Sequence, residues 1–135
     1  MTPTLSEVNS QRPQPVSTAL LLLKLALALG VATASVHVIR AVSGTAMMIA
    51  LALVIAFFAV SFLLVWRISL GNNWARILLL ILVIIGTPFS IPGYIRDLKH
   101  GLAWPTVSIL ISLLQLIGTS LLFTASANAW FRRTK

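Results

Sequence analysis

Four long apolar runs constrain the fold of this chain more than any other feature. They cover about residues 16–39, 44–66, 74–95 and 104–127. A helix rises 1.5 Å per residue, so roughly 20 apolar residues cross a hydrocarbon core about 30 Å thick. The runs lack the alternation of barrel strands, and a helix satisfies all of its own backbone groups in lipid. The sequence therefore predicts an all-α polytopic membrane protein, with four transmembrane helices in a bundle.

The composition agrees with lipid as the solvent. Of the 135 residues, 59% are hydrophobic and 9% are charged, whereas about a quarter of a soluble domain is charged. The net charge is +8, but the basic residues stand at the ends of apolar runs and do not cluster with aromatics. This distribution indicates membrane topology and argues against nucleic-acid binding. The absence of cysteine excludes disulfides, thiol catalysis and cysteine metal sites.

The first run has a second interpretation as a cleaved signal peptide, because Ala32-Thr33-Ala34 resembles a cleavage site. Two features favour a retained helix instead. The polar leader before the run is long, and Lys24 stands inside the apolar segment. We therefore expect the first run to remain as a transmembrane helix.

The lysines and arginines predict the orientation, because cytoplasmic loops carry an excess of both. Seven of the ten flank one face and three flank the other. The larger group consists of Arg12, Lys24, Arg67, Arg76, Arg132, Arg133 and Lys135. The smaller group consists of Arg40, Arg96 and Lys99. Both termini are predicted to be cytoplasmic, where arginines meet anionic lipid headgroups.

Three regions follow from this topology. Residues 1–15 hold half of the prolines and little apolar bulk, so they are expected to form a disordered cytoplasmic tail. Residues 16–131 form the predicted transmembrane domain, and residues 132–135 form a basic cytoplasmic tail. The protein is expected in the inner, or cytoplasmic, membrane of a bacterium as a multi-pass protein.

Aromatic and turn residues mark the ends of the runs. The four tryptophans all lie at predicted span ends, where indole rings settle in a bilayer; they are Trp66, Trp74, Trp104 and Trp130. Between the second and third runs, Gly71, Asn72 and Asn73 supply turn chemistry, and an asparagine can cap the following helix. A tight hairpin turn with flanking arginines at the headgroups is therefore expected.

Polar residues within the runs are candidates for function. Lys24 either extends its ammonium to the headgroups or faces the bundle and holds an anionic partner or lipid. In the fourth run, a polar stripe with helical spacing favours helix packing over a pore-lining or substrate-lining face. Its members are Ser108, Ser112, Gln115, Thr119 and Ser126. Because an unpaired amide in hydrocarbon is costly, Gln115 is expected to find a partner.

Small residues and prolines predict local geometry. Ala26, Gly30 and Ala34 repeat every four residues, and Ala52 and Ala56 do the same in the second run. Such spacing permits close approach of helices. In the third run, Pro88 and Pro92 each remove an amide donor, so a kinked or partly unwound segment is expected there.

Catalytic and metal-binding groups are scarce. Glu7 and Asp97 are the only carboxylates, and His37 and His100 are the only histidines. His37, Asp97 and His100 could meet on the outer surface, but a metal site there would be short of ligands. General acid–base catalysis needs a titratable group in a pocket. We therefore expect no enzyme, no metal and no cofactor.

Two classes of function remain. In size and helix number the chain resembles the small multidrug resistance exporters, which work as dimers and rely on a glutamate in the first helix. The corresponding run here has Lys24 and no carboxylate, so the resemblance implies architecture, and a homo-oligomeric transporter or channel would lack that proton coupling. The favoured hypothesis is a non-enzymatic protein that acts through helix–helix or lipid contacts, as an accessory subunit, an assembly factor or an immunity protein against a membrane-acting toxin.

Two short motifs carry a second resemblance. Gly71, Asn73, Trp74, Ala75 and Arg76 form a Gly-x-Asn-Trp-Ala-Arg turn, and Asn128, Trp130 and Phe131 form an Asn-x-Trp-Phe ending. In these motifs the chain resembles a loose group of uncharacterised small four-helix bacterial inner-membrane proteins. The resemblance implies topology and a bacterial setting, with no activity to transfer.

Overall fold

The fold is helical throughout the part of the chain that the structure describes. A computed structural model describes residues 12–41, 43–99, 101 and 103–133. Its helices are α2 (Gln14–Ala41), α3 (Gly44–Ser69), α4 (Asn73–Leu98), α5 (Ala103–Leu121) and α6 (Ala125–Arg133), and no strand occurs in these ranges. The predicted all-α class is therefore confirmed. The first eleven residues of the predicted tail, together with Thr134 and Lys135, lie outside the described residues.

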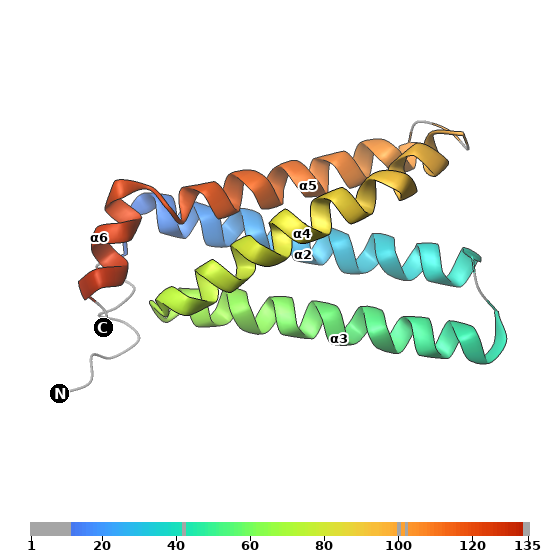
Figure 1. The fold of residues 1–135 in the computed structure, drawn as a ribbon, viewed down its shortest axis with the longest axis horizontal. Helices are drawn as coiled ribbons and strands as arrows, with labels where there is room; N and C mark the ends of the chain where they lie inside the picture. Colours follow the sequence, from blue (N-terminus) through green and yellow to red (C-terminus); the bar gives the residue numbers. More distant parts are fainter. Residues whose placement is uncertain (1–11, 42, 100, 102, 134–135) are drawn as a thin grey trace.

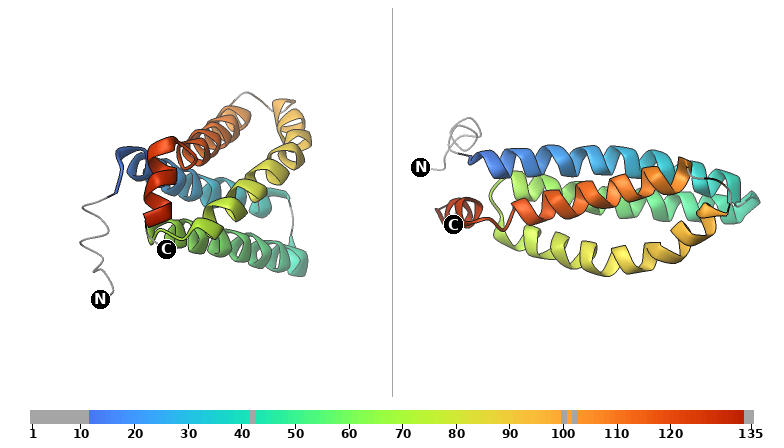
Figure 2. Two further views of the ribbon diagram at one scale, coloured as in Figure 1. Left: turned by 60° about the vertical axis from the view of Figure 1, so that its left-hand side comes forward. Right: turned by 90° about the horizontal axis from the view of Figure 1, so that it is seen from above.

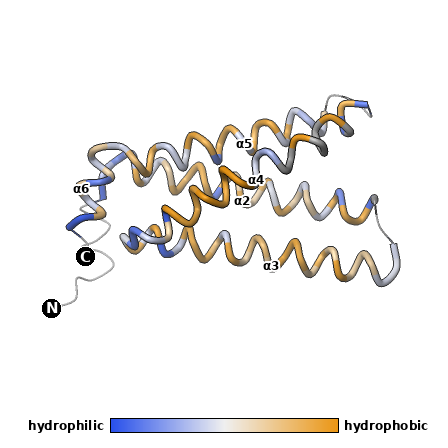
Figure 3. The backbone as a smooth tube through the Cα atoms, viewed as in Figure 1, coloured by the Kyte–Doolittle hydropathy of each residue, from blue (hydrophilic) through white to orange (hydrophobic). Residues whose placement is uncertain are grey.

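Three of the helices are long and apolar enough to cross a membrane. They are Gln14–Arg40, Gly44–Ser69 and Ala103–Leu121, while Asn73–Pro88 forms a shorter apolar helix. The apolar colour in Figure 3 fills the middle of the long helices, and the hydrophilic colour gathers at the two ends of the bundle and on α6. This distribution is that of a membrane protein.

The four long helices form an antiparallel bundle in which each contacts two neighbours. α2 packs against α3 and α5, and α4 packs against the same two helices. In Figure 1, α4 leaves the end of α3 and crosses toward the start of α5. Figure 2 shows the same arrangement from two other sides. The start of α2, the turn between α3 and α4, and α6 all lie at one end of the bundle, which we call the terminal end.

The tightly packed core lies at the terminal end. Its residues come from the start of α2, the end of α3, the start of α4 and the region from Leu122 to Phe131. The most buried members are Val16, Ala19, Val65, Ile68, Ala75, Leu122, Ala127 and Phe131. The first 17 residues of α3, by contrast, include no buried position. The bundle is thus closed at the terminal end and looser at the other.

Small residues allow close helix contact at two places. A Cβ atom added at Gly118 of α5 would lie 3.0 Å from Leu23 Cγ and 3.3 Å from the Ala19 carbonyl oxygen of α2. At Gly30 of α2 it would lie 2.8 Å from a ring atom of Phe58 in α3. The predicted close approach at Gly30 therefore fits the structure, and the glycine at 118 was not singled out from the sequence.

α4 continues through both prolines and bends without a break. The helix extends from Asn73 to Leu98, and it curves along its length in Figure 2. Pro88 has no amide hydrogen, so the Ile84 carbonyl loses its helical partner. At the preceding residue, the Thr87 hydroxyl donates a 2.7 Å hydrogen bond to the Val83 carbonyl, a contact that often bends helices. The expected kink is a curve, and the Pro92 side chain lies outside the described part.

The last long helix is shorter than expected. The fourth run suggested a span to residue 127, but α5 ends at Leu121. The Leu122, Phe123 and Thr124 amides then donate to carbonyls three residues back, at 3.0–3.4 Å, which tightens the backbone before α6 begins. α6 turns across the terminal end of the bundle (Figure 1). The Leu122 carbonyl accepts a hydrogen bond from a side chain of α4, which stabilises this end.

Candidate functional site

A buried arginine joins the two sequence motifs. Arg76, in the first turn of α4, is only 8% exposed. Its Nη1 atom donates to the Leu122 carbonyl at 2.9 Å and to Asn128 Oδ1 at 2.7 Å. Its Nε atom donates to Asn73 Oδ1 at 2.6 Å. The start of α4, the end of α5 and the middle of α6 therefore meet at one guanidinium.

Aromatic rings complete the surroundings of this guanidinium. The Arg76 Cζ atom lies 4.5 Å from the Phe131 ring centroid and 4.9 Å from that of Phe123. Asn128 Nδ2 in turn donates to the Phe123 carbonyl at 3.0 Å. We call Asn73, Arg76, Phe123, Asn128 and Phe131 the Arg76 cluster. All of its members except the arginine are neutral, so amide oxygens and ring faces stabilise the charge.

This cluster corrects one sequence-based interpretation. Arg76 was expected to meet lipid headgroups beside Arg67, but it is buried, whereas Arg67 is exposed and lies over the ring of Trp66. The reason is that α6 folds back over the first turn of α4 and supplies oxygen acceptors there. The two asparagines of the motifs, Asn73 and Asn128, were the sequence signal, because each supplies an oxygen acceptor to Arg76.

A second arginine holds the start of α2. Arg12 Nη2 donates to the Ser69 carbonyl at 2.7 Å, and its Cζ atom lies 5.9 Å from the Trp130 ring centroid. Its Nε atom is buried with no hydrogen-bond partner. Burial lowers the pKa of the Arg12 guanidinium from its ordinary value. Arg12 thus connects three segments at the terminal end.

The predicted turn has a specific backbone geometry. Gly71 adopts φ 83°, a left-handed conformation that favours glycine. The Gly71 amide donates to the Ile68 carbonyl at 2.9 Å and the Asn72 amide to the Arg67 carbonyl at 3.1 Å. This pair of hydrogen bonds is a Schellman motif, which ends α3. Asn73 begins α4 and directs its side-chain oxygen to Arg76.

A cavity of about 200 Å³ lies between the four long helices. Its walls are mainly apolar and include Leu27, Phe57, Phe58 and Leu82. Four polar side chains also line it, and they are Ser61, Thr87, Ser112 and Gln115. Among the residues that the structure describes, no ionisable one lines it. The cavity is therefore a neutral chamber with a few hydrogen-bonding groups.

The predicted polar stripe is divided between several environments. Ser112 and Gln115 line the cavity, Thr119 is 1% exposed, and Ser108 is half-buried. Ser126 is exposed on α6, so the end of α5 removes it from the stripe. Within the described ranges, the Gln115 amide hydrogen-bonds to no protein group. Packing between helices remains a prediction for this stripe.

Lys24 lies on the outer surface of α2. Its side chain is exposed, and it borders a shallow groove formed with Val31 of the same helix and Phe58 and Phe62 of α3. The side chain does not line the central cavity. Of the two interpretations left open by the sequence, this position suits extension toward the headgroups.

The tryptophans occupy different surroundings. Trp66 and Trp74 are each 51% exposed, as expected for anchors at a membrane interface. Trp104 is half-buried beneath Arg40, whose Cζ atom lies 5.0 Å from its ring. Trp130 is only 5% exposed and packs edge-to-face on Phe131, with ring centroids 4.8 Å apart. Trp130 is therefore a core residue, because α6 turns inward.

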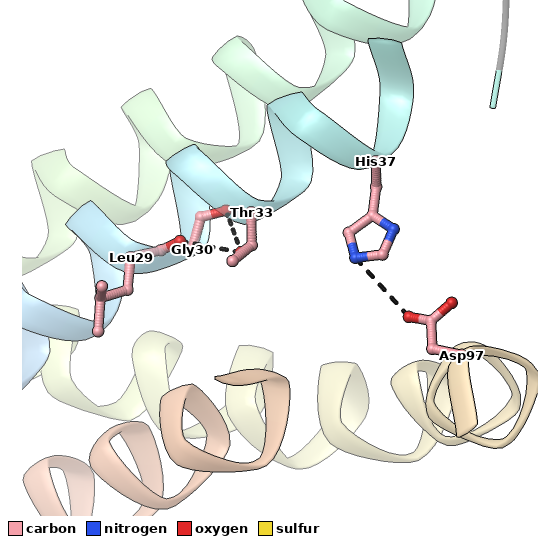
Figure 4. A network of polar contacts seen from close by, with 5 residues as sticks. All are labelled: Leu29, Gly30, Thr33, His37 and Asp97. Atoms are coloured by element: carbon pink, nitrogen blue, oxygen red, sulfur yellow. Dashed lines mark hydrogen bonds and ion pairs between the residues drawn. The ribbon is translucent and has the colours of Figure 1, made fainter. Parts of the chain in front are cut away.

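At the opposite end, His37 and Asp97 come together. His37 Nε2 lies 3.7 Å from Asp97 Oδ2 (Figure 4), and its ring lies 5.3 Å from that of Trp104. One turn before His37 in α2, the Thr33 hydroxyl donates to the carbonyls of Leu29 and Gly30. The suggested meeting of His37 and Asp97 thus occurs, while His100 lies outside the described residues. No group of three potential metal ligands occurs in the described part.

Much of the surface of α3 is left uncovered by the rest of the described chain. Large apolar side chains on several faces of its first 17 residues are more than half exposed and do not line the central cavity: Met48, Ile49, Leu53, Ile55 and Val60. Ala52 and Ala56, the small residues with four-residue spacing, are also exposed. The equivalent small residues of α2, Ala26 and Gly30, are buried. The small residues of α2 therefore pack inside the bundle, whereas those of α3 lie on its outer surface.

Searches against family models, curated proteins and solved structures found no match to this chain.

Proposed function

We propose that this protein is a non-enzymatic integral membrane protein that binds a helix of another membrane protein through α3. The observation that carries the proposal is the exposed pair Ala52 and Ala56, on a helix segment with no buried residue. Lipid gains little from small side chains, whereas a second helix approaches closely where they recur every four residues. An accessory subunit, an assembly factor or an immunity protein against a membrane-acting toxin would use such a surface.

The proposal includes four spans with both termini in the cytoplasm. A curved α4 of 26 residues has the length to cross with α2, α3 and α5. The terminal end, with Arg12, Arg67, Arg132 and Arg133, would then meet anionic headgroups, as the excess of basic residues favours. We assign the protein to a bacterial cytoplasmic membrane on the resemblance of its turn and C-terminal motifs.

Site-specific crosslinking tests the partner surface. Because the chain has no cysteine, single Ala52→Cys and Ala56→Cys variants would each carry one photoreactive maleimide in the native membrane. Leu110→Cys, on an exposed position of α5, is the matched control. We expect one adduct with a different polypeptide from both α3 positions and none from the control. An Ala56→Phe substitution beside a crosslinker at Ala52 should remove the adduct.

Each other result has a definite meaning. An adduct of twice the chain's own mass would replace the proposal with the alternative, a homo-oligomeric transporter or channel. Equal, diffuse labelling from α3 and from Leu110 would show that lipid alone covers α3, and the proposed function would be wrong.

A further inference from the structure

The central cavity combines apolar walls with several polar side chains. Ser61 and Thr87 lie on its walls, from α3 and α4, and Gln115 reaches it from α5. The Ser61 hydroxyl donates to the Phe57 carbonyl at 2.9 Å, and the Thr87 hydroxyl donates to the Val83 carbonyl at 2.7 Å. Both hydroxyl protons are therefore committed to the helices, and each oxygen keeps acceptor capacity.

The Gln115 side chain supplies the cavity with hydrogen-bonding groups that are available to a ligand. A carboxamide offers one acceptor oxygen and two N–H donors. Its amide has no protein partner among the described residues, and an unpaired amide in an apolar environment is costly. A ligand that both donates and accepts hydrogen bonds would satisfy this group.

The remaining walls restrict the ligand further. None of the described residues that line the cavity is ionisable, so a charged ligand would be desolvated there without a counter-charge from them. Leu27, Phe57, Phe58 and Leu82 offer an apolar surface. A buried water molecule needs two to four polar partners, so water would be satisfied beside the four polar side chains and not along the apolar walls. An apolar cavity of about 150 Å³ holds benzene, so about 200 Å³ accommodates a somewhat larger ring or branched chain.

We propose that this cavity is a binding site for an uncharged, membrane-soluble alcohol or phenol. Its hydroxyl group donates to the Gln115 side-chain oxygen and accepts from the Gln115 amide nitrogen. Its apolar body lies between Phe57, Phe58 and the leucines. This binding site is independent of the proposed α3 partner surface, because Ala52 and Ala56 do not line the cavity.

A pair of probes separates the polar contact from the apolar one. 2-Naphthol and naphthalene share a ring system, and only 2-naphthol has a hydroxyl group. The readout is the side-chain amide NMR signal of Gln115 in the purified, micelle-embedded full chain, titrated to saturation. Few signals of this kind are present, because the chain has three glutamines and four asparagines, and the Gln115→Leu spectrum identifies the one from Gln115. We expect 2-naphthol to bind about fivefold more tightly than naphthalene, the net value of one hydrogen bond.

Three variants complete the experiment, with methyl-group signals following binding where Gln115 is replaced. Gln115→Leu should bind both probes with equal affinity, since it loses only the polar contact. Gly86→Leu should abolish binding of both, because Gly86 lines the cavity and faces open space. Ser120→Ala removes an exposed hydroxyl of α5 and should bind as the wild type does.

Contrary outcomes are equally clear. No saturable shift with either probe in the folded wild type would mean that the cavity holds water only, and the proposal fails. Equal affinity of the two probes for the wild type, or undiminished binding by Gly86→Leu, would place the ligand elsewhere or remove the role of Gln115. None of these results bears on crosslinking at α3, so the two proposals fail separately.

Discussion

Arg76 Nη1 lies 2.7 Å from Asn128 Oδ1, so one charge-assisted hydrogen bond joins the first turn of α4 to α6. The same nitrogen donates to the Leu122 carbonyl, where α5 has just ended. These two hydrogen bonds connect α4 to the segment that follows α5. The relationship explains why a buried charge is retained at the closed end of the bundle.

The Arg76 cluster should contribute strongly to stability. Arg76→Met leaves three oxygen acceptors without their donor, and each hydrogen bond to a charged group contributes roughly 1.5–3 kcal/mol. We expect the free energy of unfolding in mixed micelles to fall by about 3 kcal/mol. Arg76→Lys should lose less of this free energy than Arg76→Met but more than none, because an ammonium lacks the planar fork of donors of a guanidinium.

Arg67→Met is the control for this prediction, because Arg67 is an exposed arginine at the same end of the bundle. It should leave unfolding unchanged. In Arg76→Met, trypsin should also cleave at Arg132 and Arg133 faster, as α6 detaches. Equal stability of Arg76→Met and Arg67→Met would mean that the cluster does not hold α6.

Two glycines in α5 and α4 should respond in opposite directions to alanine. At Gly118 a Cβ atom meets Leu23 Cγ at 3.0 Å and the Ala19 carbonyl oxygen at 3.3 Å, and overpacking costs about 1–3 kcal/mol. At Gly86 the Cβ atom meets nothing within 4 Å. Gly86→Ala should therefore gain up to about 1 kcal/mol of helix stability. Thermal unfolding should show a lower Tm for Gly118→Ala and a higher one for Gly86→Ala. A Tm for Gly118→Ala that is equal to or above the wild-type value would refute the close α2–α5 contact.

The four-span topology predicts opposite sides for two loops. In single-cysteine variants of intact cells or spheroplasts, Lys99→Cys should react with an impermeant maleimide from outside. Asn72→Cys should react only after the membrane is opened, because the turn after α3 is expected in the cytoplasm. If both cysteines react from the same side, α4 does not cross the membrane.

The burial of Trp130 predicts a contrast among the tryptophans. In variants that keep one tryptophan each, with phenylalanine at the other positions, brominated lipid should quench Trp66 and Trp74 strongly. Trp130 should be quenched weakly, because only 5% of its surface is exposed, against 51% for the other two. Strong quenching of Trp130 by lipid would show that α6 does not fold onto the bundle in a membrane.

Several features of the fold follow directly from local sequence. The all-α class and the positions of the long helices were predictable, because run length and hydropathy act within a single segment. The turn at Gly71 was also predictable, since its left-handed backbone is a property of one residue and its neighbours. The end of α5 was not, because Leu122 to Phe131 contain no helix breaker and continue an apolar run.

The sequence by itself determined that lipid surrounds this protein, where its long helices lie, and that a turn joins α3 to α4. The tertiary structure alone decided which polar residues are buried and what they contact. Arg76 meets the Leu122 carbonyl 46 residues away and Asn128 52 residues away, and Arg12 meets Ser69 57 residues away. Such pairs depend on how helices dock, and no local pattern encodes that distance. Gln115 belongs to the same class, since its position on a polar stripe does not reveal that it lines a cavity and has no partner within the described chain.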